Sequence, residues 1–165
     1  YSITDDRKKV VDFSSSYYNT PQAVITVKGS TIDGKTAIAD LASAKLGVGV
    51  GTTAVDVVTN TIGATPQVFN DNAAAVAALK NGQIDGIVVD LPTALYLSAV
   101  EVENGVIVGQ LPADSAGDNF GLLLAKDSPL TACVSSAVDA LKADGTLDQI
   151  ATTWLTDSAG APVLK

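Results

Sequence analysis

Short apolar runs alternate with amphipathic segments along most of the chain. The apolar runs predict strands at 22–28, 46–50, 67–69, 84–89, 106–108 and 120–125. Apolar residues at helical spacing predict helices over 51–61, 73–81, 92–100, 130–143 and 146–155. Strands and helices that alternate in this order indicate an α/β fold with a parallel or mostly parallel sheet.

Local signals mark the ends of some helices. Thr52 or Thr53 can cap the helix over 51–61 through its hydroxyl. Thr146 followed three residues later by a glutamine is the pattern of a capping box at the start of the last helix. The tail from Thr156 onward is predicted to be frayed.

Composition and charge limit the classes of function. The chain has 165 residues, of which 47% are hydrophobic, enough for one ordinary domain or one and a half small ones. Eighteen acidic and ten basic side chains give a net charge of −8, which argues against nucleic-acid binding because phosphates require a basic face. No apolar run approaches the length of a membrane span.

The residue types also argue against catalysis and metal binding. The chain has no histidine, the commonest general base and metal ligand, and its single cysteine excludes an intrachain disulfide framework. We therefore expect no catalytic residues, no metal and no cofactor. Cys133 is expected to be a small buried residue without a redox role, and Trp154 a buried anchor of the last helix.

Three polar features are ambiguous when the residues are considered alone. Arg7 follows two aspartates and is typical of a solvated surface charge. The glycine and two threonines at 51–53 are typical of a helix cap, and Asp90 before Pro92 is typical of a loop or cap residue. None of these features by itself indicates a binding site.

A resemblance to a known family changes this picture. The segment 1–18 has Arg7 after an aspartate-flanked hydroxyl cluster, then Val-Asp-Phe-Ser and a tyrosine pair. It resembles the bacterial extracellular solute-binding proteins of family 3, which deliver polar amino acids to ABC importers. Further matches in the family's order are Phe120-Gly121-Leu122, Lys126-Asp127-Ser128, Asp144-Gly145-Thr146 and Trp154-Leu155. The resemblance implies a periplasmic binding protein-like II fold, α/β, with two lobes and a hinge.

The same resemblance implies a domain organisation in which the chain crosses twice between the lobes. Lobe one would comprise 1–24 and a return segment, 119–165, and lobe two would be complete at 25–118. Residue 1 matches a point well inside lobe one of the family, so we expect lobe one to be incomplete, lacking its N-terminal part. The apolar surface left uncovered predicts self-association of the chain.

The resemblance also implies a ligand site formed by Ser2, Arg7, Thr52, Thr53 and Asp90. The guanidinium of Arg7 can donate two parallel hydrogen bonds to the carboxylate of an amino acid. Asp90, at the carboxyl end of its strand, would supply the counter-charge for the ammonium. The implied function is capture of an amino acid between two lobes and its delivery to an ABC permease in the membrane. The protein would be periplasmic or extracellular, and its full-length form could carry a lipid anchor.

Two other functions are open at this point. A few proteins of this architecture are dehydratases of the cyclohexadienyl or arogenate type, which need a general acid or base in the cleft. Asp90 would be the available group in this chain. The fold also occurs as the ligand-sensing domain of receptors.

Overall fold

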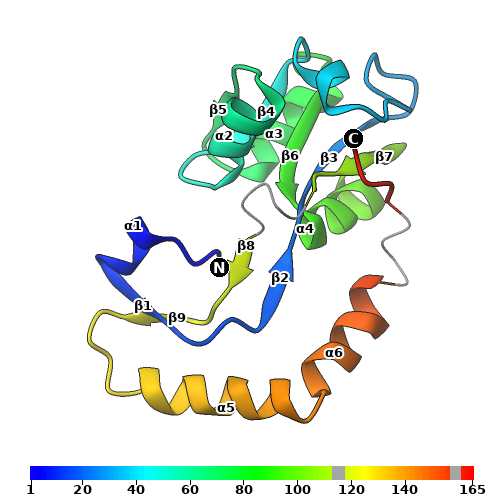
Figure 1. Ribbon diagram of the computed structural model, residues 1–165. Coiled ribbons are helices and arrows are strands. Elements are labelled where there is room, and N and C mark those ends of the chain that lie inside the picture. Colours follow the sequence, from blue (N-terminus) through cyan, green and yellow to red (C-terminus); the bar gives the residue numbers. More distant parts are fainter. Residues whose placement is uncertain (113–117, 157–160) are drawn as a thin grey trace. The chain divides into compact units, whose positions relative to one another are not determined.

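The computed structural model describes residues 1–112, 118–156 and 161–165 (Figure 1). The chain forms two compact units. Unit 1 comprises Tyr1–Thr20 and Asp118–Ser158, and unit 2 comprises Pro21–Gly117 and Ala159–Lys165. Strands and helices occur in both units, so the chain has the expected α/β composition.

Unit 2 is built on a five-stranded sheet. In spatial order its strands are β5 (Gln67–Phe69), β4 (Leu46–Gly49), β6 (Gly86–Asp90), β3 (Gln22–Val27) and β7 (Gly105–Gln110). β4 is parallel to β5 and β6, whereas β3 is antiparallel to β6 and β7. Four of the five strands therefore run in the same direction, as predicted for a mostly parallel sheet, and β3 alone is reversed. The reversal of β3 was not predicted, because apolar runs report the burial of a strand and not its direction.

Both faces of this sheet are covered. The covering elements are the 3-10 turn η1 (Ile38–Leu41), α2 (Ala54–Val57), the π-helical turn η2 (Val58–Ile62), α3 (Asn72–Lys80), α4 (Leu91–Tyr96) and the π-helical turn η3 (Leu97–Glu101). Val24 and Val88 belong to a core with residues of α2 and η2. Ile25 and Ile87 belong to a second core with residues of α3 and α4. Successive strand residues point to opposite faces, so β3 and β6 contribute to both cores and are apolar almost throughout.

The start of α2 differs from the sequence prediction. Thr53 occupies the N-cap position, but its side chain makes no capping hydrogen bond. The Thr52 hydroxyl instead donates to the carbonyl oxygen of Gly49 at 2.7 Å. The predicted hydroxyl cap is therefore wrong, and both threonine side chains are engaged elsewhere.

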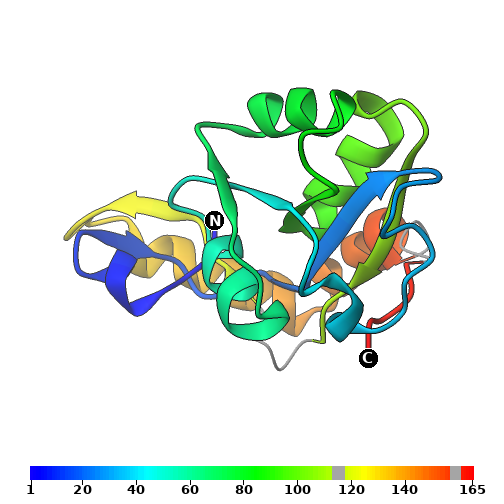
Figure 2. The same ribbon diagram turned by 90° about the horizontal axis from the view of Figure 1, so that it is seen from above.

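The C-terminal tail, defined here as residues 161–165, extends the sheet beyond β7 (red in Figures 1 and 2). The Gln110 amide donates to the Pro162 carbonyl at 2.8 Å, and the Leu164 amide donates to the Gln110 carbonyl at 2.9 Å. The terminal residue exchanges a second pair of backbone bonds: Lys165 N–H with Thr36 C=O at 3.0 Å, and Ile38 N–H with Lys165 C=O at 2.8 Å.

Leu164 anchors this tail in the core of unit 2. Its side chain is 1% exposed and belongs to the core that contains Val24 and Val88. The close approach requires glycine at position 109, where an added Cβ would lie 2.7 Å from Leu164 Cγ. The prediction of a frayed tail is wrong for these residues, and 157–160 lie outside the described part of the chain.

Unit 1 has two small antiparallel pairs and a helical segment. The pairs are β1 (Val11–Phe13) with β9 (Leu123–Ala125), and β2 (Tyr18–Thr20) with β8 (Asp118–Phe120). The helical elements are α1 (Asp5–Lys8), α5 (Thr131–Ala143), α6 (Thr146–Ala151) and the π-helical turn η4 (Thr152–Thr156). The predicted strand over 120–125 is divided, because Leu122 exchanges hydrogen bonds with Ser14 between the two pairs.

The junction of α5 and α6 also corrects a prediction. Gly145 adopts φ of +81° and is the N-cap of α6, so Thr146 is the first helical residue instead of the cap. The Thr146 amide is satisfied by the carboxylate of Asp144 at 2.9 Å. The Thr146 hydroxyl, and after it the Thr146 amide, lowers the pKa of Asp144 below its usual value.

The α5–η4 segment exposes much of its apolar surface. Its exposed large apolar side chains, with the residue preceding α5, are Leu130, Leu141, Ile150 and Trp154. Trp154 is 71% exposed and Cys133 is exposed, so the predicted burial of both side chains is wrong. Uncovered apolar surface in this region agrees with the expectation drawn from the sequence. Within the described ranges, no helix is long and apolar enough to cross a bilayer.

Replacing Leu164 with alanine should lower the free energy of unfolding of unit 2 by about 2–5 kcal/mol, the usual cost of truncating a buried leucine. Val163→Ala is the matched control, because this neighbour in the same tail is 54% exposed. The control should change stability by less than about 0.5 kcal/mol. Urea denaturation followed through the amide signals of β3 and β6 measures both, and equal effects would contradict an anchoring role for Leu164.

Candidate functional site

A small pocket lies in unit 2 at the carboxyl ends of two parallel strands. β4 ends at Gly49 and β6 at Asp90, and these strands are neighbours in the sheet. The pocket has a volume of about 70 Å³ and is lined by Gln22, Thr52, Ala54, Asn72, Val88, Val89, Asp90 and Thr93. Open α/β sheets bind ligands at this kind of edge, so the pocket is the first candidate site in unit 2.

The turn after β4 brings its threonines to this edge. Gly51 has φ of +69°, a conformation that glycine adopts without strain, and it reverses the chain between β4 and α2. An added Cβ on Gly49 would lie 3.2 Å from the methyl group of Thr52, a tight contact that the Thr52 side chain would have to shift slightly to accommodate. The glycines thereby let Thr52 pack close to the end of the strand.

Gln22 connects Thr53 to Asp90. Its Nε2 donates to Thr53 Oγ1 at 2.7 Å and to Asp90 Oδ1 at 3.3 Å. Gln22 is the first residue of β3 and lies directly opposite Asp90 in the antiparallel register. The structure therefore brings two of the predicted ligand residues together through a third side chain.

Sequence reasoning missed three polar residues of this pocket, namely Gln22, Asn72 and Thr93. Gln22 left a detectable signal, because it is a polar residue at the start of an otherwise apolar strand and is 3% exposed. A buried amide in such a run needs hydrogen-bond partners and therefore marks a polar site. Asn72 and Thr93 left no comparable signal, since both are ordinary residues for the first turn of a helix.

In unit 1, the structure places Arg7 beside Ser2. The guanidinium Nη1 donates to the Ser2 carbonyl oxygen at 2.8 Å, and Arg7 Cζ lies 4.1 Å from the ring centroid of Tyr1. Thr4 caps the single turn of α1 by accepting a hydrogen bond from the Arg7 amide at 3.2 Å. Ser2 is buried and forms a β-bridge with Phe120. The guanidinium is thus oriented by the residues on its N-terminal side.

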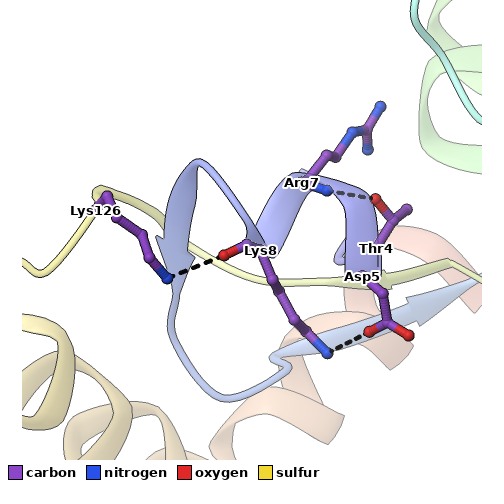
Figure 3. Close-up of polar contacts among 5 residues, drawn as sticks. All are labelled: Thr4, Asp5, Arg7, Lys8 and Lys126. Atoms are coloured by element: carbon purple, nitrogen blue, oxygen red, sulfur yellow. Dashed lines mark hydrogen bonds and ion pairs between the residues drawn. The ribbon is translucent and has the colours of Figure 1, made fainter.

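The acidic neighbours of Arg7 have other partners. Asp5 pairs with Lys8 at 3.1 Å and Asp6 pairs with Lys9, each along the exposed side of α1. Figure 3 shows the Arg7 guanidinium pointing away from the Lys8–Asp5 pair. The lysines therefore neutralise the aspartates, and the charge of Arg7 is directed elsewhere.

Lys126, which is more than a hundred residues later in the sequence, fixes the turn that follows α1. Lys126 Nζ donates to the Lys8 carbonyl at 3.0 Å (Figure 3) and to Asp12 Oδ1 at 3.1 Å. Thr131 donates to the other oxygen of Asp12 at 3.2 Å. The hydrogen bond from Lys126, helped by its charge and by Thr131, lowers the pKa of Asp12 against the opposing effect of burial.

The predicted site residues thus fall into two sets. Ser2 and Arg7 lie together in unit 1, and Thr52, Thr53 and Asp90 lie together in unit 2. Each set is organised by contacts within its own unit. In the part of the chain that the structure describes, no three cysteine or acidic side chains are grouped to hold a metal ion.

Comparisons with known proteins agree on one family. The family model for bacterial extracellular solute-binding proteins, family 3, matches residues 1–157. An L-arginine-binding protein of Pseudomonas aeruginosa is 31% identical over 165 residues, covering 90% of this chain and 60% of that protein. An L-cystine-binding protein of Escherichia coli is 30% identical, covering 99% of this chain and 59% of that protein. The chain therefore spans about 60% of the length of these relatives.

A solved structure shows the same similarity in three dimensions. An ancestral arginine-binding protein bound to glutamine is 32% identical to this chain and superimposes with a TM-score of 0.75. The match covers 93% of this chain and 68% of that protein.

The stability of unit 1 should depend on pH through Asp12. Its lowered pKa means that the folded unit favours the ionised carboxylate. The contribution of Asp12 to the free energy of unfolding is therefore fully present at pH values above 3.8, the ordinary pKa of an aspartate. It is lost as the pH falls through the lowered pKa. Asp12→Asn should therefore destabilise unit 1 at neutral pH and make no difference in stronger acid. Asp5→Asn is the control, and acid titration followed by Trp154 fluorescence measures both. A difference between Asp12→Asn and the original chain that persists unchanged in strong acid would contradict this assignment.

Proposed function

Because the chain belongs to the bacterial extracellular solute-binding proteins of family 3, as the sequence led us to expect, we propose that it captures an amino acid for an ABC importer. The proposal concerns a polypeptide of the relatives' length, of which this chain spans about 60%. The relatives reported above are named for amino-acid binding and not for catalysis. We accordingly propose a binding protein and not an enzyme.

One observation carries the proposal: each unit presents a charge suited to one end of a zwitterion. Arg7 offers a guanidinium in unit 1, and Asp90 offers a carboxylate at the pocket in unit 2. An α-amino acid has a carboxylate and an ammonium, and removing both from water requires partners for both. A ligand held by both units would therefore favour closure over opening.

The roles of the individual residues follow from their chemistry. Arg7 is proposed to donate two parallel hydrogen bonds to the ligand carboxylate, a geometry that its planar guanidinium favours. Thr53 is proposed to donate its hydroxyl proton to the same carboxylate. Thr52, whose hydroxyl proton is given to the Gly49 carbonyl, is proposed to line the site beside it. Asp90 is proposed to accept from the ligand ammonium, and Ser2 to support the guanidinium through its carbonyl.

The lining of the unit 2 pocket limits the ligand side chain. Apart from Asp90, its polar groups are the neutral side chains of Gln22, Thr52, Asn72 and Thr93. No basic side chain of the described residues lines this pocket, so a negatively charged ligand side chain would find no counter-charge here. We therefore propose a neutral or cationic amino acid. Delivery to a membrane permease and a periplasmic or extracellular location complete the proposal, with a lipid anchor as an option for the full-length protein.

Replacing Arg7 with alanine should weaken amino-acid binding about a hundredfold, or by about 3 kcal/mol, the scale for leaving a buried charge without its partner. The measurement uses a polypeptide extended to the length of the relatives. A thermal-shift screen of the twenty amino acids first identifies the ligand, and calorimetry then compares the variants.

The matched control is Lys9→Ala, which removes the cation next to α1 that pairs with Asp6. It should leave the affinity unchanged. Equal affinities of the Arg7→Ala and unsubstituted proteins would refute the role of Arg7, and a screen without any stabilising amino acid would refute the proposed function.

Self-association of the chain at its present length belongs to the same proposal. The exposed apolar side chains of the α5–η4 segment support it, with Trp154 the largest. Trp154→Asp should then shift the sedimentation of the 165-residue chain towards the monomer. Val100→Asp, an exposed apolar residue of unit 2, is the control and should have no such effect. A monomeric unsubstituted chain at micromolar concentration would contradict the expectation.

A further inference from the structure

We infer that Gln22 is a positioning residue of the ligand site, which holds the Thr53 hydroxyl and the Asp90 carboxylate in place from the point where the chain enters unit 2. The inference rests on the proposed function and adds a residue that the family resemblance did not indicate. Gln22 acts through its two neighbours, and no contact of its own with the ligand is required.

The first support is the pair of hydrogen bonds from a single buried amide group. Nε2 has two protons, and the structure directs one to Thr53 at 2.7 Å and the other to Asp90 at 3.3 Å. Gln22 is 3% exposed, so its amide is removed from water, and burying such a group without partners is costly. These bonds therefore persist without ligand and tie the start of α2 to the end of β6.

The chemistry of the partners determines the direction of the bonds. An ionised carboxylate only accepts, so Asp90 requires the amino group of Gln22 and not its oxygen. Thr53 Oγ1 accepts from the same amino group, and its hydroxyl proton therefore points away from Gln22. A threonine in this state is a donor towards other acceptors, which is the role that a ligand carboxylate demands.

The second support is the backbone around Gln22. The preceding residue, Pro21, accepts from the Leu91 amide at 3.0 Å, and the Gln22 carbonyl accepts from the Leu111 amide at 2.8 Å. The entry of the chain into unit 2 is thus bonded directly to the residue after Asp90. Any change in the path of the chain at this entry acts on Asp90 through both the backbone and the Gln22 side chain.

The test compares two glutamines of unit 2 in the polypeptide of the relatives' length. Gln22→Leu removes the amide between Thr53 and Asp90 and keeps a side chain of similar size. Gln110→Leu removes an amide of β7 that donates to the Ala161 carbonyl at 3.0 Å, away from the pocket. Calorimetry with L-arginine and with L-glutamine as probes should show binding about tenfold weaker for Gln22→Leu. Gln110→Leu should bind as the unsubstituted protein does, even where its melting temperature falls.

A double-mutant cycle separates positioning from a general loss of stability. If Gln22 acts through Thr53 as well as Asp90, Gln22→Leu should weaken binding less in the Thr53→Val background than in the unsubstituted protein, because only the bond to Asp90 is then left to remove. Additive losses, or unchanged affinity of Gln22→Leu, would overturn the inference while leaving the proposed function intact. Failure of the unsubstituted protein to bind either probe, or any other amino acid, would overturn the proposed function and the inference with it.

The side-chain amide signals of Gln22 give a measurement that needs no ligand. In the NMR spectrum of the unsubstituted protein these two protons should be protected from exchange, and both should shift in Thr53→Val. Rapid exchange like that of exposed glutamines would overturn the inference even if Gln22→Leu failed to fold.

Discussion

The antiparallel pairing of β3 with β6 is the constraint on which the candidate site in unit 2 depends. Its register sets Gln22, the first residue of β3, opposite Asp90, the last residue of the central strand β6. A slip of one residue would place Pro21 or Ala23 opposite Asp90 and turn the Gln22 amide to the other face of the sheet. The two cores resist such a slip, because β3 supplies buried residues to both of them.

Polar groups in each unit are organised before any ligand arrives. In unit 2, Gln22 engages Thr53 and Asp90, and in unit 1 the Ser2 carbonyl and the Tyr1 ring orient Arg7. Binding energy is not spent on ordering groups that are already fixed, so preorganised groups of this kind favour binding. A ligand shifts a conformational equilibrium only by its differential affinity for the two states.

Most helices and strands could be predicted from the sequence, because buried strands appear as apolar runs and buried helix faces as apolar residues at helical spacing. Strand direction is not encoded in an apolar run, and so the reversed direction of β3 was not predicted. The hydroxyls of Thr52 and Thr53 were misassigned because a helix start and a binding loop use the same residue types. Arg7, Asp90 and the threonines were singled out by family resemblance. Gln22 was missed because one polar residue beside an apolar run is typical of the end of a strand. Only the pairing register of β3 with β6 shows that Gln22 lies opposite Asp90. Trp154 was misjudged because size and hydrophobicity predict burial only where other elements are present to cover the side chain.

The fold of unit 2 depends on the C-terminal tail, which is separated from the rest of the unit in the sequence by a segment of unit 1. β7 has one edge against β3, and its other edge would expose backbone groups to pairing with other chains. The tail covers this edge through the bonds of Gln110 and places Leu164 in the core. Unit 2 therefore completes its sheet with residues that follow all of unit 1 in the sequence. Contacts of such long sequence separation require the closure of a long loop, so the entropic cost of that closure offsets part of the stability that the tail adds to unit 2.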